Sequence, residues 1–219
     1  MSEKSYPIEI DIWDIPAVRH KGRVYRVINS KKVKKGDDYI ITGVDSDRYI
    51  DVLEEIQWDE LYVRDVSSIA DIEGLSSLIF LKKLRLHHGS INKIENLETF
   101  VDLEELNLNN NQIVKISGLD ALRNLRVLFL GHNQVRDISD LSNLKNLEIL
   151  FLYDNQITKV EGLQGLENLR ELYLDNNKIS EINGISLPIN LEVLSLEGNS
   201  SEIAIENLDH HTKLKKVSK

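Results

Sequence analysis

Residues 125–146 read LRVLFLGHNQVRDISDLSNLKN, and the chain repeats the pattern of this stretch without a gap. The pattern is L-x-x-L-x-L-x-x-N-x-[IV]-x-x-[IV], with a further apolar residue at the seventeenth position; Gly89 replaces the asparagine in the first block. A fixed period of 22 residues indicates a solenoid, in which each repeat forms one coil. Five consecutive blocks begin at Leu81, Leu103, Leu125, Leu147 and Leu169.

Less regular copies flank this array. A sixth block begins at Leu191 and then slips by about one residue, which places Ile205 and Leu208 at the later apolar positions. A worn copy precedes the array, and residues 1–58 lack the repeat. We therefore predict an N-terminal cap or small α+β domain at 1–58 and a solenoid at 59–219, with regular repeats at 81–190, degenerate repeats at 59–80 and 191–213, and a partial capping strand at 214–219.

The spacing of the leucines predicts which side chains are inside. Residues four and six of a block, such as Leu128 and Leu130, are two apart and share one face of an extended segment. The apolar residues at positions eleven, fourteen and seventeen return the chain through the same interior, so each coil buries its apolar side against its neighbours. The predicted fold is an α/β solenoid with a curved parallel sheet on the concave face and a short helical or irregular convex side.

This motif resembles the leucine-rich repeat. The 22-residue form is similar to that of the intracellular regulatory subunits of protein phosphatase 1 and, more distantly, to internalin repeat regions, over about residues 59–213. The resemblance implies a non-enzymatic module that binds a protein, and a phosphatase catalytic subunit or another intracellular enzyme as the partner. The C-terminal cap of the phosphatase regulators is not evident in this sequence, which weakens the transfer of their partner.

Asparagine at position nine is expected to belong to the scaffold, because an amide at the turn out of each strand can satisfy backbone groups that the coil leaves unpaired. These residues are Asn111, Asn133, Asn155, Asn177 and Asn199.

Positions three, five and seven of each strand face outward on the concave side and are the candidate binding surface. Their central members form an apolar, aromatic patch that we expect to be exposed and to bind a protein. The alternative is that such residues merely suit strands. Charge is graded along this face, from Arg85 in the first regular coil to Glu171 and Asp175 in the fifth, which would orient a partner. The patch comprises Val127, Phe129, Ile149, Phe151, Tyr153 and Tyr173.

The N-terminal region offers a second hypothesis. We predict strands at Arg23–Asn29 and Asp38–Val44 and a helix that begins after Ser46. A basic cluster in this region could bind an anionic partner, either nucleic acid or anionic lipid, with the repeats as scaffold, or it could be a solvated hairpin on an acidic body. The cluster comprises Arg19, Lys21, Arg23, Arg26, Lys31, Lys32, Lys34 and Lys35.

The amino-acid composition excludes several classes of site and of function. Lys and Arg total 27 against 36 Asp and Glu, and this net charge of −9 argues against a surface devoted to nucleic acid. The absence of cysteine excludes disulfides, thiolate zinc sites and cysteine nucleophiles. No signal peptide, membrane span or enzyme motif is recognisable. We therefore expect a cytoplasmic protein, monomeric when unbound, without enzymatic activity, cofactor or metal.

Overall fold

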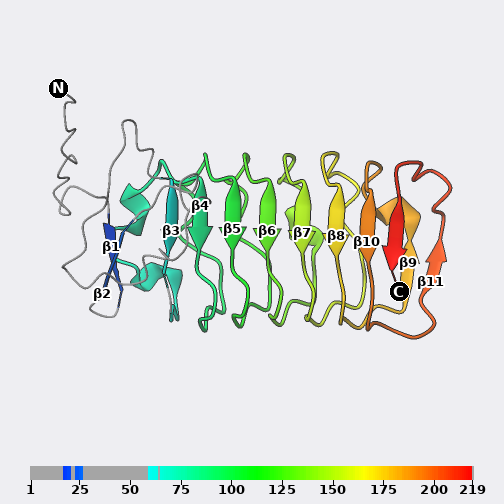
Figure 1. Cartoon of the computed structure of the whole chain (residues 1–219), viewed down its shortest axis with the longest axis horizontal. Helices are drawn as coiled ribbons and strands as arrows, with labels where there is room; N and C mark the ends of the chain where they lie inside the picture. The colour runs from blue at the N-terminus through cyan, green and yellow to red at the C-terminus, as the bar shows by residue number, and fades with distance from the viewer. Residues whose placement is uncertain (1–16, 21–22, 27–58, 64, 219) are drawn as a thin grey trace, which may run out of the picture.

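The computed structural model describes residues 17–20, 23–26, 59–63 and 65–218. Its main element is a parallel sheet with one three-residue strand from each coil, in the order β12-β10-β8-β7-β6-β5-β4-β3 (Figure 1). The strands are β3 (Glu60–Tyr62), β4 (Lys83–Arg85), β5 (Glu105–Asn107), β6 (Val127–Phe129), β7 (Ile149–Phe151), β8 (Glu171–Tyr173), β10 (Val193–Ser195) and β12 (Lys216–Ser218).

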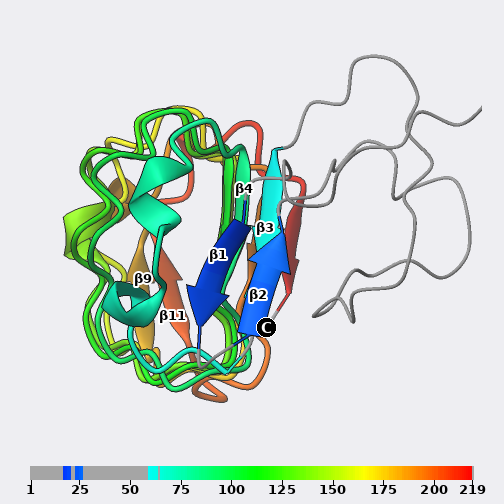
Figure 2. The same ribbon diagram turned by 90° about the vertical axis from the view of Figure 1, so that its left-hand side faces the viewer.

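The core is one continuous column of leucine, isoleucine and valine, with Phe100 among them, between the sheet and the opposite wall. Leu128 and Leu130 are 0% exposed, and the equivalent leucines of the neighbouring coils are buried in the same way. The opposite wall is irregular and carries short 3-10 turns (Figure 2). The predicted fold, a parallel-sheet solenoid with an irregular second side, is confirmed. The turns are η3 (Ile69–Asp71), η4 (Leu75–Ser77), η5 (Ser139–Leu141) and η6 (Gly184–Ser186).

The last two coils depart from the predicted pattern on this wall. Here β9 (Glu181–Asn183) pairs in parallel with β11 (Ala204–Glu206). Asn183 then caps η6 by accepting a hydrogen bond from the Ile185 amide at 3.1 Å. The turn leaves Ile185, the seventeenth residue of its block, 68% exposed, and Leu187 enters the core instead with 3% exposure.

In the sixth block the two residues expected at the later apolar positions are only partly buried. Ile205 and Leu208 pack against the edge of the core, and Ile203 is the buried residue of this segment. The difference accompanies the pairing of β11 with β9, which sets Ile205 opposite Ile182.

At the other end, β1 (Ala17–His20) and β2 (Arg23–Arg26) form an antiparallel pair. The predicted strand Arg23–Asn29 therefore overlaps β2, but its partner in the structure is β1, which the sequence analysis did not identify. The predicted strand Asp38–Val44 and the helix after Ser46 lie outside the described residues. No helix within the described part of the chain is long and apolar enough to cross a membrane.

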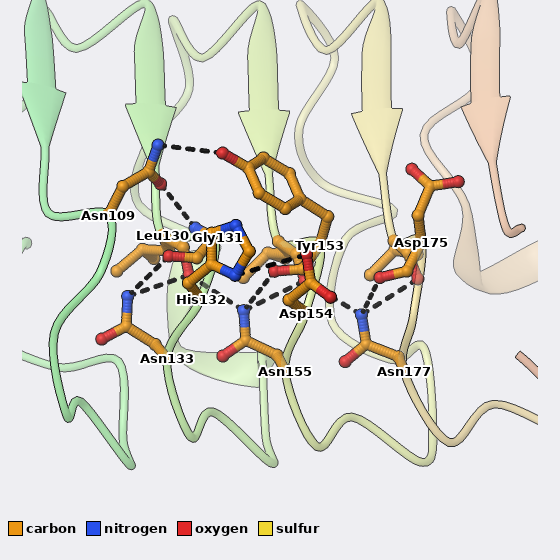
Figure 3. A network of polar contacts seen from close by, with 12 residues as sticks. Asn109, Leu130, Gly131, His132, Asn133, Tyr153, Asp154, Asn155, Asp175 and Asn177 are labelled. Carbon is orange, nitrogen blue, oxygen red and sulfur yellow. Dashed lines mark hydrogen bonds and ion pairs between the residues drawn. The ribbon is translucent and has the colours of Figure 1, made fainter. Parts of the chain in front are cut away.

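The position-nine asparagines join neighbouring coils. Asn133 donates from Nδ2 to the carbonyl oxygens of Leu108 and Leu130, each at 3.0 Å, and its Oδ1 accepts from the Ile113 amide at 3.0 Å. Asn155 and the other members of this asparagine ladder bond in the same way (Figure 3). These bonds satisfy buried backbone groups that the short strands leave unpaired, as the sequence predicted.

The residue at position eight has positive φ in every regular coil. The chain turns sharply out of the strand there, and His, Asn and Asp tolerate the left-handed region better than other side chains do. The sixth block has Gly198 at this position, with φ of 71°. The five others have φ between 52° and 58° and are His88, Asn110, His132, Asp154 and Asn176.

Charges alternate in sign along position two, just before each strand. The Lys82 ammonium lies 3.5 Å from the Glu104 carboxylate, and Arg126 Nε lies 2.9 Å from Glu148 Oε1. Each such exposed pair stabilises the fold only slightly, but the alternation keeps like charges apart on neighbouring coils at position two. The full series is Asp59, Lys82, Glu104, Arg126, Glu148, Arg170, Glu192 and Lys215.

Candidate functional site

Three aromatic rings stack on the solvent side of the main sheet, which we call the sheet face. Phe129 and Phe151 lie with ring centroids 4.7 Å apart and planes inclined by 5°, and Phe151 and Tyr173 lie 4.7 Å apart at 11°. The register aligns these residues on β6, β7 and β8, so the ring separation matches the spacing of about 4.8 Å between strands. We call these three residues the aromatic ladder.

The rings of the ladder are half-buried rather than fully exposed, which corrects the expectation from sequence. Each ring covers part of its neighbour, and this mutual burial could not be read from the alternation of inward and outward positions. Val127 and Ile149 are also half-buried and are register partners at position three of β6 and β7. They extend the apolar surface beside the rings.

Tyr153 lies beside the ladder and is held by the two preceding coils. Figure 3 shows its contact with Asn109. Its ring is 6.4 Å from that of Phe151, nearly perpendicular to it. Its hydroxyl accepts a hydrogen bond from Asn109 Nδ2 at 3.1 Å, and Asn109 Oδ1 accepts from the Gly131 amide at 2.6 Å. Burial raises the pKa of Tyr153, the nearby Asp154 raises it further, and the bond from Asn109 opposes both. The phenol is thus neutral and fixed in place.

Carboxylates flank the Tyr173 end of the ladder. The Tyr173 hydroxyl donates to Glu171 Oε2 at 2.7 Å; this bond, together with burial and the charges of Glu171 and Asp175, raises the pKa of Tyr173 to about 12. Asp175 Oδ1 accepts from the Ser195 hydroxyl at 2.6 Å and from the Glu197 amide at 2.9 Å. The structure therefore places the predicted residues Glu171 and Asp175 next to the aromatic patch.

The predicted basic end of the sheet face is largely neutralised. Arg85 Nε lies 2.6 Å from Glu60 Oε1, and Arg85 Nη2 lies 2.9 Å from Glu105 Oε1. Lys83 Nζ lies 3.8 Å from Glu105 Oε2. The structure therefore corrects the expectation that Arg85 is a cation available to a partner, because carboxylates on both neighbouring strands pair with it.

The structure places only three members of the N-terminal basic cluster. Arg19 lies in β1, and Arg23 and Arg26 lie in β2. Lys21, Lys31, Lys32, Lys34 and Lys35 lie outside the described residues. Within the described residues, no group of three or more His, Asp or Glu side chains is arranged to hold a metal ion.

Sequence reasoning missed the residues that support the patch. Gly131 leaves the space that the Tyr153 ring occupies, since a β-carbon there would come within 2.4 Å of the ring. Ser195 fixes Asp175, and His132 packs edge-on against Tyr153 at 5.1 Å. The pairing of a glycine at position seven with a tyrosine at position seven of the next block was a usable signal for the first of these.

The repeats match a known family model. Residues 101–143 and 145–187 match the model described as leucine-rich repeats (two copies). A comparison with curated proteins gave no match.

Three solved structures illustrate what the fold is similar to. Internalin InlF of Listeria monocytogenes is 27% identical, with a TM-score of 0.58 over 72% of this chain and 46% of its own. Internalin C2 of the same organism is 29% identical, with a TM-score of 0.55 over 74% of this chain and 80% of its own. A leucine-rich-repeat protein of Leptospira interrogans is 24% identical, with a TM-score of 0.62 over 70% of this chain and 40% of its own.

The chain matches less than half the length of internalin InlF, and the similarity to the Leptospira protein bears on the fold alone. The family match and the parallel sheet agree on the architecture. The coils described here are leucine-rich repeats stacked into a solenoid.

Proposed function

We propose that this chain is a non-enzymatic scaffold or regulatory module that binds a protein partner on the sheet face through its aromatic patch. The observation that carries the proposal is the aromatic ladder, a stack of three rings on the solvent side of the sheet. Phe and Tyr are common anchors of protein interfaces, and a contiguous apolar surface on a soluble domain marks an interaction site.

The fold itself does not require rings in this column. Position five holds Arg85, Asn107 and Ser195 in other strands, and these strands pair in the same register as the ring-bearing ones. Strand propensity alone therefore accounts poorly for three successive aromatic residues.

The geometry also favours docking energetically. The rings of the ladder restrict one another, and Tyr153 is fixed by Asn109 and Gly131, so little side-chain entropy remains to be lost when a partner binds. A rigid, preformed surface of this kind supports recognition by shape.

The resemblance to phosphatase regulators supplies one candidate partner, a phosphatase catalytic subunit, and with it an intracellular site of action for a monomeric chain. The three structures named above are not phosphatase regulators and do not bear on that candidate. The sheet face supports a protein partner whichever enzyme or receptor it is.

Affinity capture from the native cell tests the proposal. The bait would be the full chain as wild type, as Phe129→Ala with Phe151→Ala, and as the control Val114→Ala with Ile185→Ala, which removes exposed apolar side chains outside the ladder. We expect the ladder variant to lose a partner that the control retains, while circular dichroism shows both folded. Equal capture of the same proteins by all three baits would contradict the proposal.

A further inference from the structure

The two ends of the aromatic ladder differ. On the strands beyond Phe129, position five is held by Asn107 and then by Arg85, whose guanidinium forms ion pairs with two carboxylates. Beyond Tyr173 the same position is held by Ser195 and Ser218, whose hydroxyls lie 2.9 Å apart. Neither serine is long enough to cover a tyrosine ring, and no other ring of the described residues stacks on that face of Tyr173. Tyr173 is therefore the last ring of the ladder at this end; it is half-buried, and the neighbouring Ser195 is buried.

Three carboxylates lie at this end of the sheet face. Glu171 lies in β8, two residues before Tyr173, and Asp175 follows β8, two residues after Tyr173. Glu197 occupies the same position of the next coil as Asp175 does in its own. Within the described part of the chain, none of the three has a Lys, Arg or His nitrogen within 4.0 Å.

Hydrogen bonds orient these acidic groups. Asp175 Oδ1 is held by the Ser195 hydroxyl and the Glu197 amide, which leaves its second oxygen available. Glu171 accepts from the Tyr173 hydroxyl through Oε2, which leaves Oε1 available. Along the column of position-three residues that contains Glu171, the nearest cation is Lys216, which lies two strands away on β12. The contrast with Arg85 is direct: the cations at one end of the sheet face are paired within the chain, and the acids at the other end are not.

The carboxylates at the Tyr173 end of the ladder favour a basic side chain of the partner at this place. A purely apolar or acidic segment docked on Tyr173 would remove these carboxylates from water without a counter-charge, at a considerable cost in free energy. An arginine avoids that cost, because its planar guanidinium can stack on the ring and donate in its plane to a carboxylate beside it. Lysine supplies the charge but not the planar stacking.

Building on the proposed function, we infer that the partner presents a basic segment to the sheet face, with an arginine that stacks on Tyr173 and pairs with Glu171 or Asp175. The apolar part of the same segment covers Phe151 and Phe129. The aromatic ladder supplies the anchoring surface, and the carboxylates at one end fix the direction in which the segment lies.

A display library of random linear dodecapeptides tests this inference with the full chain as bait. Peptides would be selected on the wild type and counter-selected on Phe129→Ala with Phe151→Ala, so that only binders that depend on the ladder remain. We expect arginine to be enriched among these peptides well above lysine and above its frequency in the unselected library.

A synthetic peptide of the consensus then measures the contribution of charge. We expect Glu171→Gln with Asp175→Asn to weaken its binding about tenfold at low salt, and replacement of its arginine by the neutral isostere citrulline to do the same. The control Glu161→Gln with Glu167→Gln removes the same charge from exposed positions outside the sheet face and should leave affinity unchanged.

The outcomes separate the inference from the proposed function. Ladder-dependent peptides without arginine enrichment, or with affinity unchanged in the Glu171/Asp175 variant, would overturn the inference and leave a protein-binding ladder in place. Failure to select any ladder-dependent peptide would count against both.

Discussion

The ring of Tyr153 lies directly over the α-carbon of Gly131 in the preceding coil. A β-carbon built at Gly131 would be 2.4 Å from the ring Cζ of Tyr153, closer than two non-bonded carbons can come. The glycine thus allows the tyrosine to lie across two coils and reach Asn109 with its hydroxyl.

Gly131→Ala should therefore displace the Tyr153 ring and break its hydrogen bond to Asn109. We expect the free energy of unfolding to fall by about 1–3 kcal/mol, the usual cost of overpacking. The pKa of Tyr153 should move toward the ordinary value as the ring loses its burial, because burial is the main cause of its rise. Urea denaturation and ultraviolet titration, each compared with Tyr153→Phe, measure the two effects.

Gly165→Ala is the matched control for this variant. The nearest atom to a β-carbon there is the flexible end of Lys145, at 3.1 Å, so the stability should change by less than about 1 kcal/mol. A similar loss of stability in both variants would mean that Gly131 is needed for its backbone conformation and not for the space it leaves to the Tyr153 ring.

The two asparagine positions of the repeat should differ in their contribution to stability. Asn133→Ala leaves the buried Ile113 amide without its partner and removes one of the two asparagine donors from each of the Leu108 and Leu130 carbonyls, and we expect a loss of about 2–3 kcal/mol. Asn146, at position 22, donates one exposed bond to the Arg123 carbonyl at 2.8 Å, which water can replace, so Asn146→Ala should cost less than about 1 kcal/mol.

Urea denaturation of both alanine variants at one temperature checks this ordering. Losses of equal size would show that the position-nine bonds stabilise the coil no more than a surface contact does.

The sequence predicted the repeat architecture because each coil has the same physical task. The leucines at positions one, four and six must point inward in every copy, so the same inward pattern recurs in all five regular blocks. The same argument could have found two features that we did not predict. His, Asn or Asp at position eight of a block indicates a residue with positive φ. The asparagine at position 22 in four blocks, such as Asn124 and Asn146, indicates a second series of hydrogen bonds between coils.

The predictions that failed concern contacts between particular side chains. Ile185 fits the apolar pattern, but the cap that Asn183 supplies to η6 turns it outward. Arg85 fits the column of outward residues, but carboxylates at position three of both neighbouring strands, Glu60 and Glu105, pair with it. The stacking within the aromatic ladder depends on rotamers that no alternation of residue types specifies. A regular pattern therefore predicts direction, inward or outward, and does not predict the contacts that side chains make on the surface.

Tyr173 should make stability depend on pH in the alkaline range. Its pKa of about 12 in the folded chain exceeds the ordinary value of 10, so the folded state keeps a proton that the unfolded state releases. The stabilisation is fully present below about pH 10 and is lost as pH rises toward 12. Because the chain has seven tyrosines, the effect is isolated as the difference between wild type and Tyr173→Phe in urea unfolding from pH 8 to pH 12.

Glu171→Gln provides the complementary test of that phenol. Since the hydrogen bond to Glu171 is the largest cause of the shift, the variant should lower the pKa of Tyr173, seen by ultraviolet titration. An unchanged midpoint would show that burial alone sets the pKa.

Neighbouring residues on one strand should differ sharply in what they contribute to folding. Leu128 is 0% exposed, so Leu128→Ala removes methyl groups from the centre of the core and should cost about 2–5 kcal/mol. Phe129 is half-buried and stacks on one ring, so Phe129→Ala should cost only about 1–2 kcal/mol. Phe151 stacks on two rings, so Phe151→Ala should fall between them. Thermal and urea unfolding give the order; a loss at Phe129 as large as at Leu128 would place its ring in the core and remove the basis for a binding face.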